Sequence, residues 1–130
     1  MGTMRIFIAS PDDKFRLALL MFLDDEPGMA VVGLSDRLTG LLTQLEGAEP
    51  DVLLLDWASS VQSMADLLIG LHTLERRPKT IVFSTKPEEK ETTLAAGADY
   101  FISKAAPPDE LLPILNDIRL SKISFNQKER

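Results

Sequence analysis

Three reactive groups stand at the ends of apolar runs in this chain: the carboxylate of Asp56, the hydroxyl of Ser84 and the ammonium of Lys104. Brought together, these groups suit the transfer of a phosphoryl group to the carboxylate. Asp56 would be the nucleophile and would form an acyl phosphate. Ser84 would donate a hydrogen bond to a phosphoryl oxygen, and Lys104 would pair with its charge. These residues are the first candidates for chemistry.

The run before Asp56 has the length of a buried strand. Residues 52–55 are all aliphatic and follow Pro50-Asp51, as expected for a strand covered on both faces of a parallel sheet. In open α/β sheets, reactive groups lie just beyond the carboxyl ends of such strands. Asp56 therefore stands where a site is expected.

Strand-like and helix-like segments alternate along the whole chain. The strands are expected over residues 5–9, 31–34, 52–56, 80–84 and 100–103, and the helices over residues 15–23, 38–45, 64–71, 87–96 and 107–118. Few large apolar residues occur in 87–96, which predicts the most loosely held helix there. Short connections require right-handed crossovers and helices on both faces. We therefore predict an α/β fold with a five-stranded parallel sheet covered on both faces. Asp56, Ser84 and Lys104 converge if the strands take the order 2-1-3-4-5, and we predict this (βα)5 flavodoxin-like arrangement.

Composition limits the classes of partner. The chain has 130 residues, enough for one domain with its own core, and a net charge of −6, which disfavours direct binding to a nucleic-acid backbone. It contains no cysteine, no signal-peptide pattern and no uncharged stretch of bilayer length. We expect a soluble cytoplasmic protein without membrane contact. It would consist of a domain over residues 4–120 and a polar tail, or the start of a linker, over 121–130.

The motifs Pro50–Asp56, Ile81–Ser84 and Ala96–Lys104 occur in this order along the chain. Together they resemble the receiver domain of bacterial response regulators, the signalling proteins of two-component systems. The resemblance spans residues 5–120. Among receivers, the chain is most similar to those that precede helix-turn-helix DNA-binding domains. It implies the same five-stranded fold.

The resemblance also implies a role for each candidate residue. Asp56 matches the phospho-acceptor, Ser84 the hydroxyl that follows the phosphoryl group, and Lys104 the lysine of the site. Phe101 matches the aromatic residue that turns inward on activation. Phosphorylation would then shift the population toward a state with a changed surface, formed by the fourth helix, the fifth strand and the fifth helix. The implied partner at that surface is a histidine kinase or another signalling protein, with a homodimer as an alternative.

The metal pocket of the family is altered in this chain. Receivers carry two adjacent acidic residues after the first strand, which hold Mg²⁺ together with the phospho-acceptor, and Ser10-Pro11 stand at that place here. Neither side chain supplies an anionic ligand, although Mg²⁺ needs carboxylates to be held. Asp12 and Asp13 lie two positions further on and would reach the site only through a remodelled loop. We therefore expect Mg²⁺ binding to be weak or absent.

Two smaller departures follow the candidate residues. The turn over residues 57–61 differs from the Met-Pro-Gly-type turn of the family, so the backbone carbonyl of Ala58 is a doubtful metal ligand, and Trp57 is a candidate to fill the metal's space. Thr85 stands where receivers have a small residue and should narrow the path to the phosphoryl group.

Each candidate also has a purely structural interpretation. Asp56 and Lys104 would form an ion pair even without phosphoryl transfer, and Ser84 would cap a helix. Phe101 would simply belong to the core. The acids Asp12-Asp13 would stabilise the first turn of the first helix.

Three functions remain compatible with the sequence. The first is a receiver-like interaction switch with Asp56 at the phospho-acceptor position and an impaired Mg²⁺ pocket. The second is a fully phosphorylatable receiver in which Asp12 or Asp13 rebuilds the Mg²⁺ site; its enzyme activity would be at most self-phosphorylation at Asp56. The third is a flavodoxin-like domain that binds a nucleotide or flavin, which the lack of a Gly-rich loop after residues 5–9 argues against.

Overall fold

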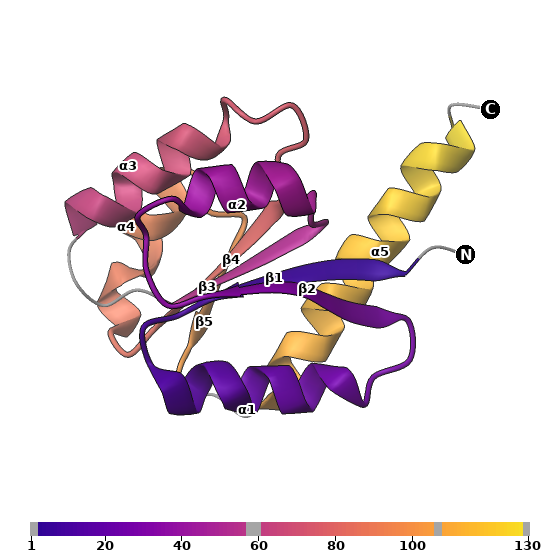
Figure 1. Cartoon of the computed structure of the whole chain (residues 1–130), viewed down its shortest axis with the longest axis horizontal. Coiled ribbons are helices and arrows are strands. Elements are labelled where there is room, and N and C mark those ends of the chain that lie inside the picture. The colour runs from indigo at the N-terminus through magenta and orange to yellow at the C-terminus, as the bar shows by residue number, and fades with distance from the viewer. Residues whose placement is uncertain (1–2, 57–60, 106–107, 129–130) are drawn as a thin grey trace.

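The computed structural model describes residues 3–56, 61–105 and 108–128. Five parallel strands form one sheet in the order β2-β1-β3-β4-β5, which confirms the predicted order. The strands are β1 (Met4–Ala9), β2 (Met29–Ser35), β3 (Val52–Asp56), β4 (Lys79–Ser84) and β5 (Tyr100–Ser103). All five strands end at the same edge of the sheet, on the left in Figure 1.

Helices cover both faces of this sheet, as predicted. They are α1 (Asp13–Asp24), α2 (Leu41–Ala48), α3 (Val61–Leu71), α4 (Lys90–Ala95) and α5 (Leu111–Lys128), with short 3₁₀ turns η1 (Pro87–Glu89) and η2 (Pro108–Glu110) before the last two. Buried residues of α1 and α5 belong to one apolar cluster, and those of α2 and α3 belong to a second. Figure 1 shows α1 below the sheet and α2 and α3 above it.

The alternation of side chains along each strand divides residues between the two faces. On β4, Ile81 and Phe83 pack with the α1/α5 cluster, whereas Val82 packs with the α2/α3 cluster. Ser84 follows the same alternation and is directed to the second face, where Leu94 of α4 also packs. On the strand β5, Ile102 belongs to the first cluster. Lys104 follows two residues later, so the same alternation directs its side chain to the face of the sheet that α1 covers.

Several boundaries differ from the predicted ones. The second helix begins at Leu41 rather than near residue 38, because Gly40 precedes it with a left-handed φ of 78° that breaks the helical path. The segment over 87–96 divides into η1 and the six-residue α4, none of whose residues is buried, in keeping with a loosely held helix.

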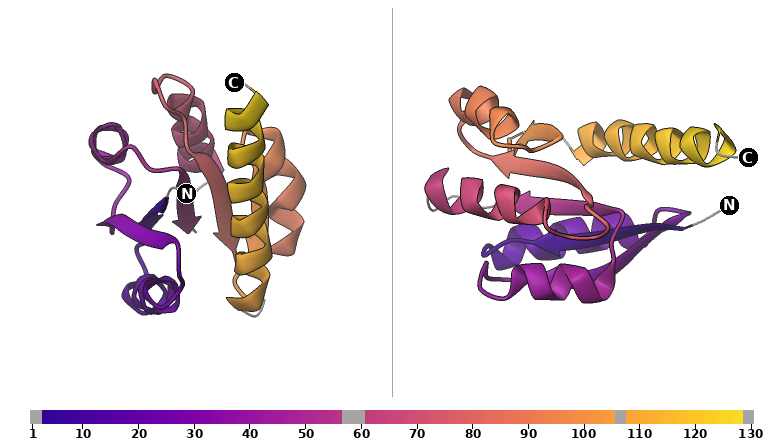
Figure 2. Two further views of the ribbon diagram at one scale, coloured as in Figure 1. Left: turned by 90° about the vertical axis from the view of Figure 1, so that its right-hand side faces the viewer. Right: turned by 90° about the horizontal axis from the view of Figure 1, so that it is seen from above.

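The last helix is longer than expected. It continues to Lys128, so most of the predicted tail over 121–130 has a helical backbone. No glycine or proline follows Pro113, so nothing in the sequence stops the helix after the buried residue Ile118. Figure 2 shows α5 running past the sheet toward the side where the N-terminus lies. Within the described ranges, no helix is both long and apolar enough to cross a membrane.

Candidate functional site

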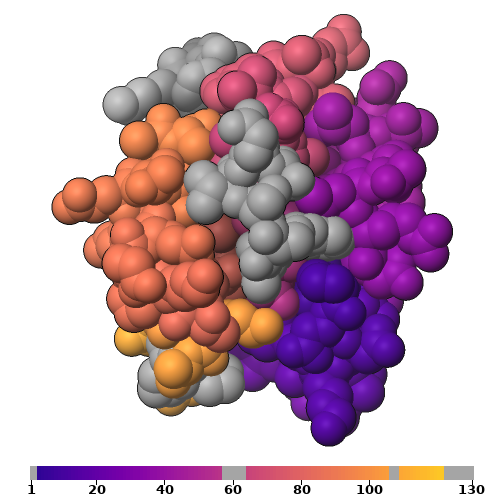
Figure 3. All heavy atoms as spheres, turned by 90° about the vertical axis from the view of Figure 1, so that its left-hand side faces the viewer, coloured from indigo at the N-terminus to yellow at the C-terminus, as the bar shows by residue number. Residues whose placement is uncertain are grey.

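Asp56 is the last residue of the central strand β3 and is only 3% exposed. Its Oδ2 accepts two hydrogen bonds, from Nζ of Lys104 at 3.0 Å and from Oγ of Ser10 at 2.6 Å. A buried carboxylate is costly without such partners, and charge-assisted bonds of this length are the strong kind. The predicted meeting of Asp56 and Lys104 is present at the carboxyl edge of the sheet, the edge that faces the viewer in Figure 3.

Lys104 lies among several groups rather than one. Its Nζ is 3.0 Å from Asp56, 3.6 Å from Oδ2 of Asp12 and 4.4 Å from the centre of the Phe15 ring. The same ring meets Phe83 of β4 edge to face, at 5.2 Å between centroids. The ammonium is therefore held by two carboxylates and by the face of an aromatic ring, which also attracts cations.

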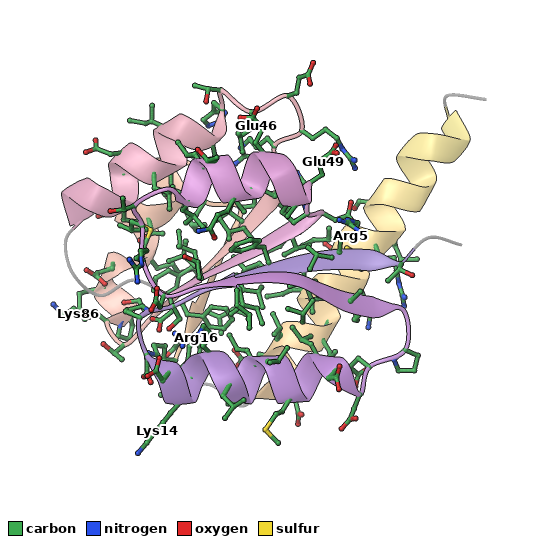
Figure 4. The ribbon with its side chains drawn as sticks, viewed as in Figure 1. Arg5, Lys14, Arg16, Glu46, Glu49 and Lys86 are labelled. Atoms are coloured by element: carbon green, nitrogen blue, oxygen red, sulfur yellow. The ribbon has the colours of Figure 1, made fainter. Side chains whose placement is uncertain are left out.

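The hydrogen bond from Ser10 to Asp56 was not predicted from the sequence. We expected it only as a lost metal ligand, yet it is 1% exposed and donates its hydroxyl proton to Asp56. Its own amide donates to the carbonyl of Ser35 at 2.9 Å, and its hydroxyl oxygen accepts from the amide of Asp12 at 3.1 Å. Arg16 reaches back from α1 to the carbonyl of Ser10 at 2.7 Å, and Figure 4 shows this arginine near the strand ends.

The two acids after Ser10-Pro11 take different places. Asp12 is the N-cap of α1: its Oδ1 accepts from the amides of Lys14 and Phe15 at 3.0 and 3.2 Å. The amide of Phe15 holds the pKa of Asp12 below its ordinary value, and the ammonium of Lys104 acts in the same direction. Asp13 is exposed and pairs with Arg16. Only Asp12 therefore contacts the candidate site.

Ser84 lies at the end of β4, as predicted, but its hydroxyl group bonds to the turn that follows. It donates to Oε1 of Glu89 at 2.6 Å and accepts from the amide of Lys86 at 3.0 Å. Phe101 is half-buried against the α2/α3 cluster, and Thr85 is exposed. Glu89 was not among the predicted site residues, because nothing in its spacing marks it as the partner of Ser84.

Two predicted features of the metal pocket are the backbone carbonyl of Ala58 and the side chain of Trp57. Ala58 and Trp57 lie outside the described residues, so the predictions made for them stay predictions. Among the residues that are described, no group of three or more His, Cys, Asp or Glu side chains is placed to hold a metal ion.

No protein-family profile matches the sequence. Among curated proteins, the chain is similar to the protein-glutamate methylesterase/protein-glutamine glutaminase of Geobacillus kaustophilus, with 29% identity over 120 residues. The match covers 85% of this chain and 33% of that protein. The chain thus spans about a third of the length of this relative.

Solved structures give a fuller match. The signal receiver domain of the putative response regulator NarL from Mycobacterium tuberculosis superposes with a TM-score of 0.79 at 22% identity, over 90% of this chain and 96% of that one. The fold is that of a receiver domain. The response regulator domain of Thermotoga maritima CheB gives a TM-score of 0.68 at 20% identity, over 91% of this chain and 95% of that one. RcsB from Salmonella enterica, bound to a promoter, gives a TM-score of 0.75 at 18% identity, over 97% of this chain and 69% of that one.

Proposed function

We propose that this chain is a receiver-like signalling domain of a two-component phosphorelay, in which Asp56 holds the phospho-acceptor position and the Mg²⁺ pocket is impaired. One observation carries the proposal. Oδ2 of Asp56 is bound both by the lysine expected in a receiver and by the hydroxyl of Ser10, which stands where the family has an acidic metal ligand. The position of the receiver site is kept while its ligand chemistry is changed.

Among the described residues, the donors around Asp56 are a poor match for Mg²⁺, which supports the proposal of an impaired pocket. This ion prefers a near-ideal octahedron of oxygen ligands with carboxylates among them. Here Ser10 is neutral, and the single ammonium of Lys104 already lies near the carboxylates of both Asp56 and Asp12. A dication would have to displace Lys104 or share its carboxylates with it, at a cost in electrostatic repulsion.

Of the two acids, the fully phosphorylatable alternative would depend on Asp12, because Asp12 contacts Lys104 whereas Asp13 is exposed and pairs with Arg16. Asp12 would also have to give up its contact with Lys104. Any enzyme activity would be self-phosphorylation at Asp56. We do not propose binding of a nucleotide or flavin, because Ser10-Pro11-Asp12-Asp13 follows β1 in place of a Gly-rich phosphate loop.

The proposed output is recognition of another protein through the face formed by α4, β5 and α5. Candidate partners are a histidine kinase, another signalling protein or a second copy of this chain. Direct binding to nucleic acid is not proposed for this acidic domain, and a cytoplasmic location is part of the proposal.

Phosphorylation with a small phosphodonor tests this function. The protein is incubated with acetyl phosphate and Mg²⁺, and the added mass is measured on the intact chain. We expect no phosphorylation of the wild type and a gain in Ser10→Asp, which returns a carboxylate to the pocket and which the further change Asp56→Asn abolishes. Thr43→Asp, which adds the same charge at an exposed position of α2, is the control. Stoichiometric phosphorylation of the wild type at Asp56 would favour the fully phosphorylatable receiver.

A further inference from the structure

The hydroxyl of Ser84 makes two hydrogen bonds on the α4 side of the sheet. Its proton is donated to Oε1 of Glu89 over 2.6 Å, and its oxygen accepts the amide proton of Lys86 over 3.0 Å. The acceptor is a carboxylate, so the bond to Glu89 belongs to the stronger, charge-assisted kind. Both Ser84 and Glu89 are half-buried, which limits competition from water.

A serine hydroxyl has one proton to donate. Ser84 can therefore donate to Glu89 or to an anion at Asp56, but not to both. Donation toward Asp56 requires rotation of the Ser84 side chain away from Glu89. The two hydrogen bonds define two mutually exclusive states of one side chain, and the structure contains the state in which Ser84 donates to Glu89.

Glu89 connects the two states of the Ser84 hydroxyl to a helix. It is the last residue of η1 and the residue immediately before α4. The helix itself has six residues, none of them buried, so little apolar packing fixes it to the sheet. The bond from Ser84 thus links the end of β4 directly to the start of the most weakly packed helix.

We propose that Glu89 is a positioning residue: it latches the Ser84 hydroxyl toward α4, and loss of this hydrogen bond releases the start of α4. The proposal deepens the proposed receiver function: it rests on the switch role that the receiver resemblance implies for Ser84, and it assigns the group that holds this hydroxyl in the resting state. Any anion at Asp56 that accepts the hydrogen bond of Ser84 in place of Glu89 opens the latch. The surface around α4 then changes without any direct contact between that anion and the helix.

The neighbouring Glu88 provides a matched control. It lies on the same 3₁₀ turn and carries the same charge, but it is exposed and makes no hydrogen bond or ion pair with any residue of the described ranges. A general effect of charge near α4 would appear equally in variants of Glu88 and Glu89. A latch would appear only in those of Glu89.

A double-mutant cycle read by amide hydrogen exchange tests the latch. Exchange is measured at residues 94–96, where Ala96 donates to the carbonyl of Thr92 at 3.0 Å and so reports on the closed helix. Ser84→Ala and Glu89→Ala should each raise the exchange rate about fivefold, in line with the loss of one partly solvated charged hydrogen bond. Because both remove the same bond, the double variant should be no faster than either single variant.

Two further variants complete the cycle. Glu89→Gln keeps an acceptor oxygen and should retain part of the protection, while Glu88→Ala should match the wild type. Multiplicative effects of Ser84→Ala and Glu89→Ala, or equal effects of Glu88→Ala and Glu89→Ala, would overturn the latch. The cycle uses neither phosphodonor nor Mg²⁺, so its failure is distinct from a failure of the proposed function, which the phosphorylation experiment detects.

Discussion

The two halves of the candidate site differ in how firmly their side chains are held. On the α1 side, the carboxylate of Asp56 is buried and is contacted by both Lys104 and Ser10, and Lys104 is further held by Asp12 and the ring of Phe15. On the α4 side, Glu89, just before a helix without buried residues, is the only side chain among the described residues to which Ser84 is hydrogen-bonded. The two halves would therefore have different roles. The carboxylate of Asp56 is held in a fixed position, whereas the proposed loss of one hydrogen bond releases the start of α4.

The largest effect is expected from removal of the central cation. Lys104→Met should destabilise the fold by about 3 kcal/mol, because it leaves the buried carboxylate of Asp56 without its countercharge. Urea unfolding measures the free energy, and Lys90→Met at an exposed position of α4 is the control. Addition of Asp56→Asn to Lys104→Met should recover part of the loss; no recovery would mean that the two residues are not coupled.

The next effect concerns the hydroxyl that stands in the metal-ligand position. Ser10→Ala should cost about 2 kcal/mol of unfolding free energy, since it removes a buried bond to a charged acceptor. Ser35→Ala is the matched comparison: this buried serine donates to the carbonyl of Arg37 at 2.8 Å, a neutral bond worth about 1 kcal/mol. Equal costs for Ser10→Ala and Ser35→Ala would argue against a charge-assisted bond at Asp56.

A smaller effect is expected from the aromatic ring beside Lys104. Phe15→Leu should cost about 1 kcal/mol more than Phe22→Leu, because both rings pack against the same cluster but only Phe15 contacts an ammonium and a second ring edge. Thermal and urea unfolding of the two variants give the comparison. If Phe22→Leu proves as costly as Phe15→Leu, the contact with Lys104 contributes nothing.

The smallest effect is a pH dependence of stability that arises from Asp12, on the α1 side of the site. The pKa of Asp12 is lowered in the folded protein, so its carboxylate contributes stability that is present above its unfolded pKa and is lost as pH falls through the folded value. Asp12→Asn keeps a capping side chain but removes the charge. The stability difference between wild type and Asp12→Asn should therefore shrink as the pH falls below about 4. Urea midpoints across a pH series measure it, and a constant difference would contradict this assignment.

Much of the fold follows from the apolar pattern alone. The all-aliphatic run over 52–55 predicts a central buried strand that ends at Asp56, and alternation with helical periods predicts the parallel sheet. The approach of Lys104 to Asp56 follows from the same topology, because the carboxyl ends of parallel strands meet at one edge. These features depend on burial, which the sequence pattern encodes directly.

The choice of hydrogen-bond partner does not follow from that pattern. Ser10 follows β1 in a loop and Glu89 ends the 3₁₀ turn η1. The local backbone direction decides which group each side chain meets, and nothing in their spacing specifies Asp56 or Ser84 as partners. Helix ends depend on similarly local features. The left-handed backbone of Gly40 delays α2, and the lack of any stop signal after Pro113 lets α5 continue to Lys128.

The central claim, an acceptor position without an effective metal pocket, is tested most directly by titration with Mg²⁺. Trp57 is the single tryptophan of the chain and adjoins Asp56 in sequence, so its fluorescence should respond to a bound ion. We predict no change at millimolar Mg²⁺ and no stable beryllofluoride adduct. A saturable change in Trp57 fluorescence that disappears in Asp56→Asn would contradict the account.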